Sequence, residues 1–381
     1  MNLALSDEQV FLREAARGAL SRFKTLEAAR EALDTPNWGT GGDENAMPDL
    51  WPTAREAGWP GLLIGEQHGG AGLDAFDAML VLGECGRVIA GIELLGHLPA
   101  TAILDASSNA PMLDELATGE KRAAYLPASP PDDLGGDWSC DPAHGMQRGE
   151  APVVSAEGAV SGELAFVPDA PGADLLVGVA LQGGKPVGVA IEAGASGVTI
   201  EEVHRYDATR SLGHVSLEDA PATVLDCSED TLTGAWYLAQ ALIAAESLGS
   251  VETALDVSVA YAKERFTFGR AIGSYQAVKH ALTEVLRELE NGRSLLYYAG
   301  WARQGAPGEF PLAASAARSV AGRALDDAAR TMISVHGGIG ATWEHDAPLY
   351  FRRAQLSRRL LGGTARATDR VAGELLTQAA A

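Results

Sequence analysis

Hydrophobic and polar positions follow helical spacing over the first third of the chain. Ser6 and Gln9 have the spacing of a capping box, and apolar residues then recur every three or four positions. A polar stretch at 34–49 interrupts this pattern, and the apolar run 75–88 restores it. We therefore predict mainly helices over residues 6–125, broken by a long loop.

The pattern changes near Arg122. From there to Asp226 the chain is rich in Gly, Pro and Val, and its apolar runs are short, as at 164–167 and 175–180. Short apolar runs bounded by turn-forming residues are typical of strands. This segment predicts a small β domain.

Beyond Asp230 the composition returns to Ala, Leu, Glu and Arg with few prolines. Helices followed by strands and then by helices predict an α+β fold rather than an alternating parallel sheet. Helical periodicity covers roughly 231–265, 274–304, 311–337 and 346–378. We expect an N-terminal helical domain over 1–121, a middle β domain over 122–230 and a C-terminal helical bundle over 231–381.

Composition narrows the classes of partner. A net charge of −22 argues against nucleic acid and anionic membranes, because binding phosphate backbones requires clustered cations. Cys85, Cys140 and Cys227 lack metal-ligand spacing and predict reduced thiols and no metal site. The chain shows no leader pattern and no apolar run of about twenty residues, so we expect a cytoplasmic protein.

Two segments within the C-terminal helical region carry candidate chemistry. Residues 265–276 offer a cation at Arg265 and an amide at Gln276, with a glycine between them. Residues 336–340 form a His-Gly-Gly-x-Gly break whose glycines let backbone approach a ligand closely. Taken singly, each segment could equally be a surface loop or a helix break. Together they suit a phosphate diester.

In order and spacing, the two segments strongly resemble the acyl-CoA dehydrogenase family. The resemblance rests on YAKERFTFGRAIGSYQAVKH at 261–280 and on VHGGIGATWEHD at 335–346. Upstream, ExxGGxGL at 66–73 and DxTR at 207–210 fit the same family. It implies a helical domain, a middle β domain and a C-terminal four-helix bundle, and an enzyme that binds FAD and dehydrogenates acyl-CoA between Cα and Cβ.

The resemblance also implies site residues. These cofactor segments would contact the pyrophosphate and adenosine half of FAD, the second of them on the cofactor of a neighbouring subunit. Ser334 stands where the family usually has Gln. The implied FAD contacts are Arg265, Thr267, Phe268, Gln276, Ser334, Val335, His336, Gly337 and Gly338.

Other family features are missing. The catalytic base in many members is the Glu of a Tyr-Glu-Gly-Thr segment, which corresponds here to Leu-Gly-Gly-Thr with Gly362 at the base position. Other members place the Glu where this chain has Ala239, and neither residue can accept a proton. The segment whose backbone and hydroxyl bond the flavin ring corresponds to Phe166–Pro168, and proline has no N–H.

This asymmetry resembles the base-lacking subunit of heteromeric α2β2 acyl-CoA dehydrogenases of actinobacteria that shorten steroid side chains. The resemblance implies an acyl-CoA substrate, a homologous catalytic subunit and an electron-transfer acceptor. One alternative is a homo-oligomeric, self-sufficient dehydrogenase with Glu246 as a relocated base, although a buried Glu paired with a bundle arginine is another role for this residue. A third is a family relative with changed flavin chemistry.

Overall fold

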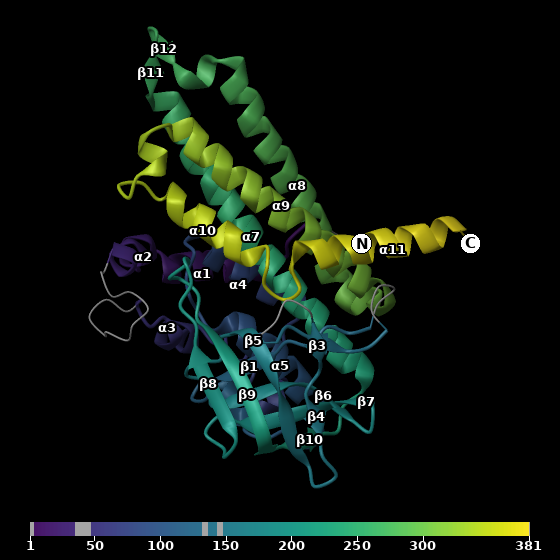
Figure 1. Cartoon of the computed structure of the whole chain (residues 1–381). Coiled ribbons are helices and arrows are strands. Elements are labelled where there is room, and N and C mark those ends of the chain that lie inside the picture. The colour runs from purple at the N-terminus through teal and green to yellow at the C-terminus, as the bar shows by residue number, and fades with distance from the viewer. Residues whose placement is uncertain (1–3, 35–46, 132–135, 143–147, 381) are drawn as a thin grey trace.

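The computed structural model describes residues 4–34, 47–131, 136–142 and 148–380. Its elements follow the expected order of helices, strands and helices (Figure 1), which confirms the predicted α+β fold. The domain boundaries expected at 121/122 and 230/231 stay predictions. No helix in the described ranges is long and apolar enough to cross a bilayer.

The N-terminal part is helical, and side-chain caps begin two of its helices. Ser6 and Gln9 form the predicted capping box at the start of α1, and Asp74 forms another at the start of α4. The helices are α1 (Asp7–Leu20), α2 (Thr25–Asp34), α3 (Trp51–Glu56), η2 (Glu66–His68), α4 (Ala75–Arg87), α5 (Leu94–Asp105) and α6 (Leu113–Ala117). Most of the loop predicted at 34–49 lies outside the described residues.

The middle part is one main sheet with one small strand pair, β2 and β3, outside it. In the main sheet β1 (Ala123–Leu126) runs parallel to β6, while β5 and β9 form a long antiparallel pair. The other strands are β2 (Ser139–Cys140), β3 (Gly149–Glu150), β4 (Val153–Val154), β5 (Ala159–Pro168), β6 (Leu175–Gln182), β7 (Lys185–Glu192), β8 (Val198–Glu202), β9 (Leu212–Pro221) and β10 (Thr223–Leu225).

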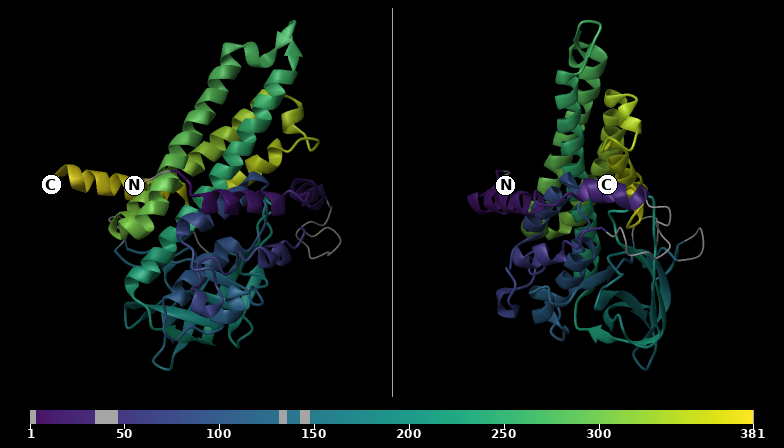
Figure 2. Two further views of the ribbon diagram at one scale, coloured as in Figure 1. Left: turned by 180° about the vertical axis from the view of Figure 1, so that it is seen from behind. Right: turned by 90° about the vertical axis from the view of Figure 1, so that its left-hand side faces the viewer.

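Both faces of β6 are buried. Leu175, Val177 and Val179 belong to the large core shared with the helices, while Leu176 and Ala180 belong to a second core within the β part. This alternation explains why β6 reads as a continuous apolar run rather than as a half-polar strand. The sheet is thereby fixed against the helices, and the β part lies at the lower end of the bundle, away from the bundle's tip (Figure 2).

The C-terminal part contains α7 (Glu229–Glu264), α8 (Gln276–Gly305), α9 (Phe310–His336), α10 (Ala347–Ser357) and α11 (Gly363–Ala380). Three short 3₁₀ turns lie between the helices of this part. They are η3 (Ile272–Ser274), η4 (Pro307–Glu309) and η5 (Ile339–Ala341). The prediction of one helix over 346–378 is wrong. Leu361, Gly362 and Gly363 all have positive φ, and this backbone ends α10 and starts α11 in a new direction.

Helix α7 packs against both the N-terminal helices and the bundle. A Cβ at Gly86 of α4 would lie 1.9 Å from the Glu246 carbonyl oxygen of α7, and one at Gly249 would lie 1.9 Å from the Gly83 carbonyl oxygen. Only glycine permits this close crossing. The crossing fixes α7 against the N-terminal helices and sets the position of its buried Glu246.

Candidate functional site

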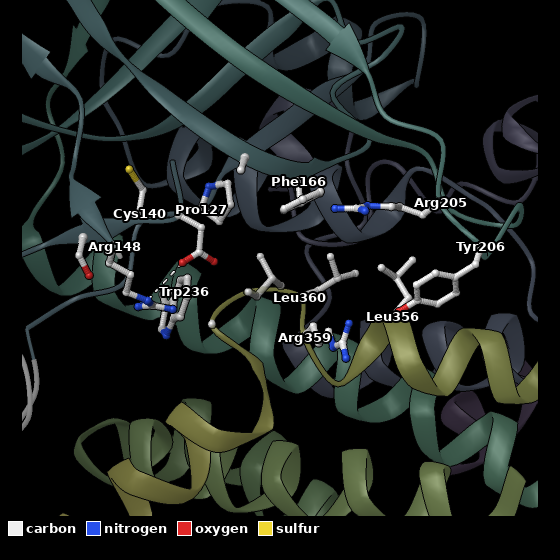
Figure 3. A pocket seen from close by; sticks show the side chains of 15 residues that line it. Pro127, Cys140, Arg148, Phe166, Arg205, Tyr206, Trp236, Leu356, Arg359 and Leu360 are labelled. Atoms are coloured by element: carbon white, nitrogen blue, oxygen red, sulfur yellow. Dashed lines mark ion pairs between the residues drawn. The ribbon is translucent and has the colours of Figure 1, made fainter. Parts of the chain in front are cut away.

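A cavity of about 120 Å³ lies between the end of β5 and the turn that joins α10 to α11. Figure 3 shows its side chains coming from the β part above and from the bundle below. It includes Gly362, the residue expected from the resemblance to stand at the position of the catalytic base. The lining residues are Pro127, Ser139, Cys140, Asp141, Arg148, Ala165, Phe166, Arg205, Tyr206, Trp236, Leu356, Arg359, Leu360, Leu361 and Gly362.

The backbone at Gly362 does not suit a side chain. Its φ is +76°, and a Cβ built there would lie 2.6 Å from Arg148 Nη2 and 3.5 Å from the Trp236 ring. A residue such as Glu would therefore be strained at this position and would displace the Arg148 guanidinium. The space next to the base position is occupied by a cation from the β part.

Arg148 is held by one carboxylate. Its Nε lies 3.2 Å from Asp141 Oδ1, and both side chains line the cavity. Its Nη1 is buried and makes no hydrogen bond to the residues that the structure describes. Asp141 is the single carboxylate among the lining residues, and Arg148 already neutralises it. Neither residue was singled out from the sequence, because nothing local marks them.

The opposite side of the cavity carries two further arginines. The Arg205 guanidinium carbon lies 4.5 Å from the centre of the Phe166 ring, a cation–π contact. Arg359 follows α10 and faces the same space beside Leu360 (Figure 3). Charged groups therefore stand at both ends of the cavity, with apolar side chains between them.

Strand β5 contains the segment expected to face a flavin ring, and its backbone N–H donors there are already engaged. The Phe166 amide donates to His214 Nδ1 at 3.3 Å, and the Ala165 amide donates to the Asp141 carbonyl oxygen at 2.6 Å. Phe166 itself has φ of +52°, and Pro168 has no amide hydrogen. Burial raises the pKa of Cys140 to about 11, so this thiol is neutral. These residues do not fit the polar edge of an isoalloxazine.

Buried polar side chains hold the turn that contains Gly362. Gln240 Nε2 donates to the Leu361 carbonyl oxygen at 2.9 Å. Arg318 Nη2 donates to the carbonyl oxygens of Ser357 and, at 3.2 Å, Leu360. Burial lowers the pKa of Arg318 to about 10, which leaves it charged at neutral pH. Ala239, the other family base position, is buried beside Gln240 and carries no functional group.

The first cofactor segment forms a hairpin at the tip of the bundle, far from the sheet (Figure 1). Strands β11 (Phe266–Thr267) and β12 (Arg270–Ala271) pair across Phe268 and Gly269, which have φ of +50° and +79°. Phe268 is 98% exposed, and Arg265 and Gln276 are also exposed. These exposed groups can contact a ligand that lies outside their own chain.

The second cofactor segment ends α9 at the same end of the bundle. The Tyr261 and His336 rings lie 4.3 Å apart, which joins the end of α7 to the end of α9. His336 is buried and its Nδ1 lies 2.7 Å from the Met332 carbonyl oxygen. Ser334, Gly337 and Gly338 are exposed, whereas Val335 is half-buried. The structure thus brings both segments together, with His336 directed inward.

The cofactor segments and the cavity lie at distant points of α7. Trp236 lines the cavity and Arg265 follows the last turn, and 29 helical positions separate them, which is roughly 43 Å at 1.5 Å per residue. One dinucleotide does not span such a distance. The two segments expected to bind a cofactor therefore cannot contact the same dinucleotide as a ring placed in this cavity.

Glu246 is 3% exposed and belongs to a buried ion cluster. Its Oε1 lies 2.7 Å from Arg353 Nη1, and its Oε2 pairs with Arg210. Arg353 Nε also lies 2.7 Å from Asp207 Oδ2, so α7, α10 and the end of the β part meet here. Glu246 is thus paired with a bundle arginine, the second of the two roles expected for it, and it does not line the cavity.

Comparison with known proteins places the chain among relatives of one kind. Residues 6–129 match the acyl-CoA dehydrogenase N-terminal domain and residues 234–376 match the acyl-CoA dehydrogenase C-terminal domain. The chain is 31% identical over 358 residues to acyl-CoA dehydrogenase IpdE2 of Mycobacterium tuberculosis, covering 93% of each protein. It is 32% identical over 382 residues to acyl-CoA dehydrogenase FadE34 of the same organism, but spans only 49% of that relative.

Two solved structures share the fold over nearly the whole chain. A variant of the Tcur3481–Tcur3483 steroid ACAD has a TM-score of 0.83 and 26% identity, covering 98% of this chain and 99% of the other. The ChsE4–ChsE5 complex from Mycobacterium tuberculosis has a TM-score of 0.82 and 21% identity, covering 99% of each. At that identity the second likeness shows the fold alone.

Proposed function

Because the chain belongs to the acyl-CoA dehydrogenase family, we propose that it is the non-catalytic subunit of a heteromeric acyl-CoA dehydrogenase. Members of this family are FAD-dependent oxidoreductases that act on acyl-CoA, as expected from the sequence. In the proposed complex this chain binds the adenosine half of FAD, and a homologous partner supplies the base and the contacts to the flavin ring.

The observation that carries the proposal is the environment of Gly362. This position has no carboxylate, its φ is positive, and the Arg148 guanidinium occupies the adjacent space. Asp141 is the only carboxylate among the lining residues and is paired with that arginine. A general base must come within hydrogen-bond reach of the proton it removes, with its oxygen free to accept it. Among the described residues that line this cavity, no carboxylate oxygen is free to do so.

The cofactor segments support a role in trans. Arg265 can meet a phosphate through its fork of N–H donors, and the exposed backbone at Gly337 and Gly338 allows close approach. FAD supplies the hydride acceptor for Cα–Cβ oxidation when bound, while these residues would only anchor its pyrophosphate and adenosine. Since they lie roughly 43 Å along α7 from the cavity, the cofactor they hold belongs to a neighbouring subunit.

The self-sufficient alternative with Glu246 as base is weaker. Both carboxylate oxygens of Glu246 are engaged by arginines, and the side chain is buried outside the cavity. Proton abstraction there would require both ion pairs to open in the interior. We therefore assign Glu246 a structural role.

The size of the cavity bears on the acyl group. Ligand pockets are typically about 300–1,000 Å³, whereas this cavity measures about 120 Å³. The alanines of α7 that could have widened a pocket, Ala239, Ala241, Ala244 and Ala245, are buried in helix packing. A bulky acyl group such as a steroid, the class named for one similar structure, would therefore bind in the partner subunit.

The proposal is tested by turnover. The purified chain, supplied with FAD, is assayed for dehydrogenation of short-chain, long-chain and steroid side-chain acyl-CoA thioesters with a dye as electron acceptor. We expect no turnover from the chain alone. We expect turnover when it is combined with a homologue that carries the Glu of the Tyr-Glu-Gly-Thr segment, and loss of that turnover on Arg265→Gln. Turnover by the chain alone at the rate of the combined subunits would overturn the proposal.

A further inference from the structure

We propose that the cavity beside Gly362 binds a small organic carboxylate with an apolar body, in place of a flavin ring. The inference rests on the proposed function in one respect, since it requires that this cavity hold no flavin of its own. It goes further by assigning a ligand class to the cavity.

The charge at the cavity is opposite to that of the molecule. The chain carries −22 overall, yet the lining residues comprise three arginines and one aspartate. Asp141 neutralises Arg148, which leaves the positive charge of the exposed Arg205 and Arg359 without an acidic partner among the described lining residues. A cleft lined by one sign of charge with low-dielectric walls concentrates ligands of the opposite sign. The expected ligand is therefore an anion.

Arg148 provides a donor that is in place and unused. Its Nε binds Asp141, while its buried Nη1 has no hydrogen-bond partner in the described ranges. A buried guanidinium N–H without a partner costs free energy, and an incoming carboxylate oxygen would satisfy it. Its Nη2 lies 2.6 Å from where a Cβ of residue 362 would stand, so glycine keeps the approach to this donor open.

The middle of the cavity is apolar. Phe166 and Leu360 lie between Arg148 and Trp236 at one end and Arg205 at the other, with Arg359 below Leu360 (Figure 3). The volume of about 120 Å³ is close to the roughly 150 Å³ of an engineered cavity that holds benzene. A body of about one ring or a short aliphatic chain would fill it. A nucleotide or an intact flavin would not.

Carboxylate suits this environment better than phosphate. The apolar walls make it costly to desolvate a doubly charged group, whereas a single charge can be matched by one guanidinium fork. Cys140 adds no competing charge, since its raised pKa keeps it a neutral thiol. The carboxylate could be a free acid or the far end of an acyl-CoA, and the chemistry that this cavity recognises is the same for both.

Isothermal titration of the full-length chain with benzoate and with benzamide tests the assignment. The two probes share a shape and differ in charge. We expect benzoate to bind at least tenfold more tightly than benzamide. Arg148→Gln and Arg359→Gln should each weaken benzoate binding about tenfold or more, while Arg287→Gln, which removes an exposed arginine of α8, should leave it unchanged. Circular dichroism checks that each variant is folded.

Equal binding of benzoate and benzamide would overturn the inference. So would the absence of benzoate and glutarate binding to both wild type and the Arg287→Gln control at concentrations up to about 10 mM, the order of magnitude of a weak ligand. A comparison of glutarate with glutaryl-CoA identifies the source. Tighter binding of the thioester that is lost in Arg148→Gln supports an acyl-CoA, and equal binding supports a free acid. The visible absorbance of the same samples reports flavin, so failure of the proposed function is recognised separately.

Discussion

Replacing Glu246 by Gln distinguishes a structural residue from a catalytic one. Glu246 and Asp207 face Arg210 and Arg353 in a cluster whose four side chains are each at most 4% exposed. The four charges sum to zero, and the substitution leaves one uncompensated positive charge in the interior. It also turns an amide N–H toward a guanidinium donor. Removing one partner of a buried ion pair costs about 3–5 kcal/mol.

The expected change in melting temperature follows from the length of the chain. At about 2.1 cal/mol/K per residue, the 381 residues give an unfolding entropy of about 0.8 kcal/mol/K, so the loss corresponds to about 4–6 °C. Differential scanning calorimetry measures it. Glu252→Gln, on the same helix but 30% exposed, is the matched control and should cost about 1 kcal/mol or less.

A double variant sharpens the test. Glu246→Gln combined with Arg210→Gln restores neutrality and should recover at least half of the lost stability, because the two residues are directly paired. In the combined complex, Glu246→Gln should retain turnover at temperatures where the variant is folded. An unchanged melting temperature with complete loss of turnover would refute the structural assignment and favour Glu246 as the base.

Three further predictions follow from buried or exposed groups. Burial raises the pKa of Asp169 to about 7, so its contribution to stability is full below pH about 4 and is lost as the pH rises through 7. Asp169→Asn keeps the acceptor for the Gly96 amide. In urea titrations this variant should reduce the difference in unfolding free energy between pH 5 and pH 8 by about 3 kcal/mol. Gly362→Glu should lower the melting temperature and confer no turnover on the chain alone, since the new side chain meets Arg148 at positive φ; measurable dehydrogenation would contradict the site geometry. Arg265→Gln should weaken FAD binding by the combined complex about tenfold or more in flavin-release titrations without a change in melting temperature, because Arg265 is exposed; unchanged affinity would remove it from the cofactor site.

Asp207 changes the stability with pH in the opposite direction to Asp169. Burial opposes ionisation of Asp207, but Arg353 and Thr209 more than offset it and lower the pKa of Asp207 below its ordinary value. Its contribution is therefore present above pH about 4 and is lost as the pH falls further. Stability should accordingly fall below pH 4 even though Asp169 favours acid, and this loss should be smaller in a variant that lacks Arg353.

Much of the fold follows from local patterns. The helix predicted at 231–265 is observed as α7, Glu229–Glu264, because its start carries an N-cap at Ser228 and its interior contains no proline. The predicted helix over 346–378 fails at Leu361–Gly363, where tertiary contacts from Gln240 and Arg318 hold a positive-φ turn. Helical periodicity on either side did not reveal that turn.

The candidate site was only partly predictable. Gly362 stood out because a residue type needed for proton abstraction is missing from a recognisable segment. Arg148, Arg205 and Arg359 carry no such signal, since they come from three separate segments and meet only when the sheet closes on the bundle. The sequence could thus reveal which group is absent, whereas the cation that occupies its place required the structure.

The most direct test of the half-site account is the ratio of FAD to chain, measured by absorbance after heat release, for the chain purified alone and for the chain combined with its catalytic homologue. We predict a ratio near zero for the folded chain alone, and a combined complex whose FAD is lost on Arg265→Gln in this chain. About one FAD per chain in the protein purified alone would contradict the account, because the cavity beside Gly362 would then hold a complete flavin site.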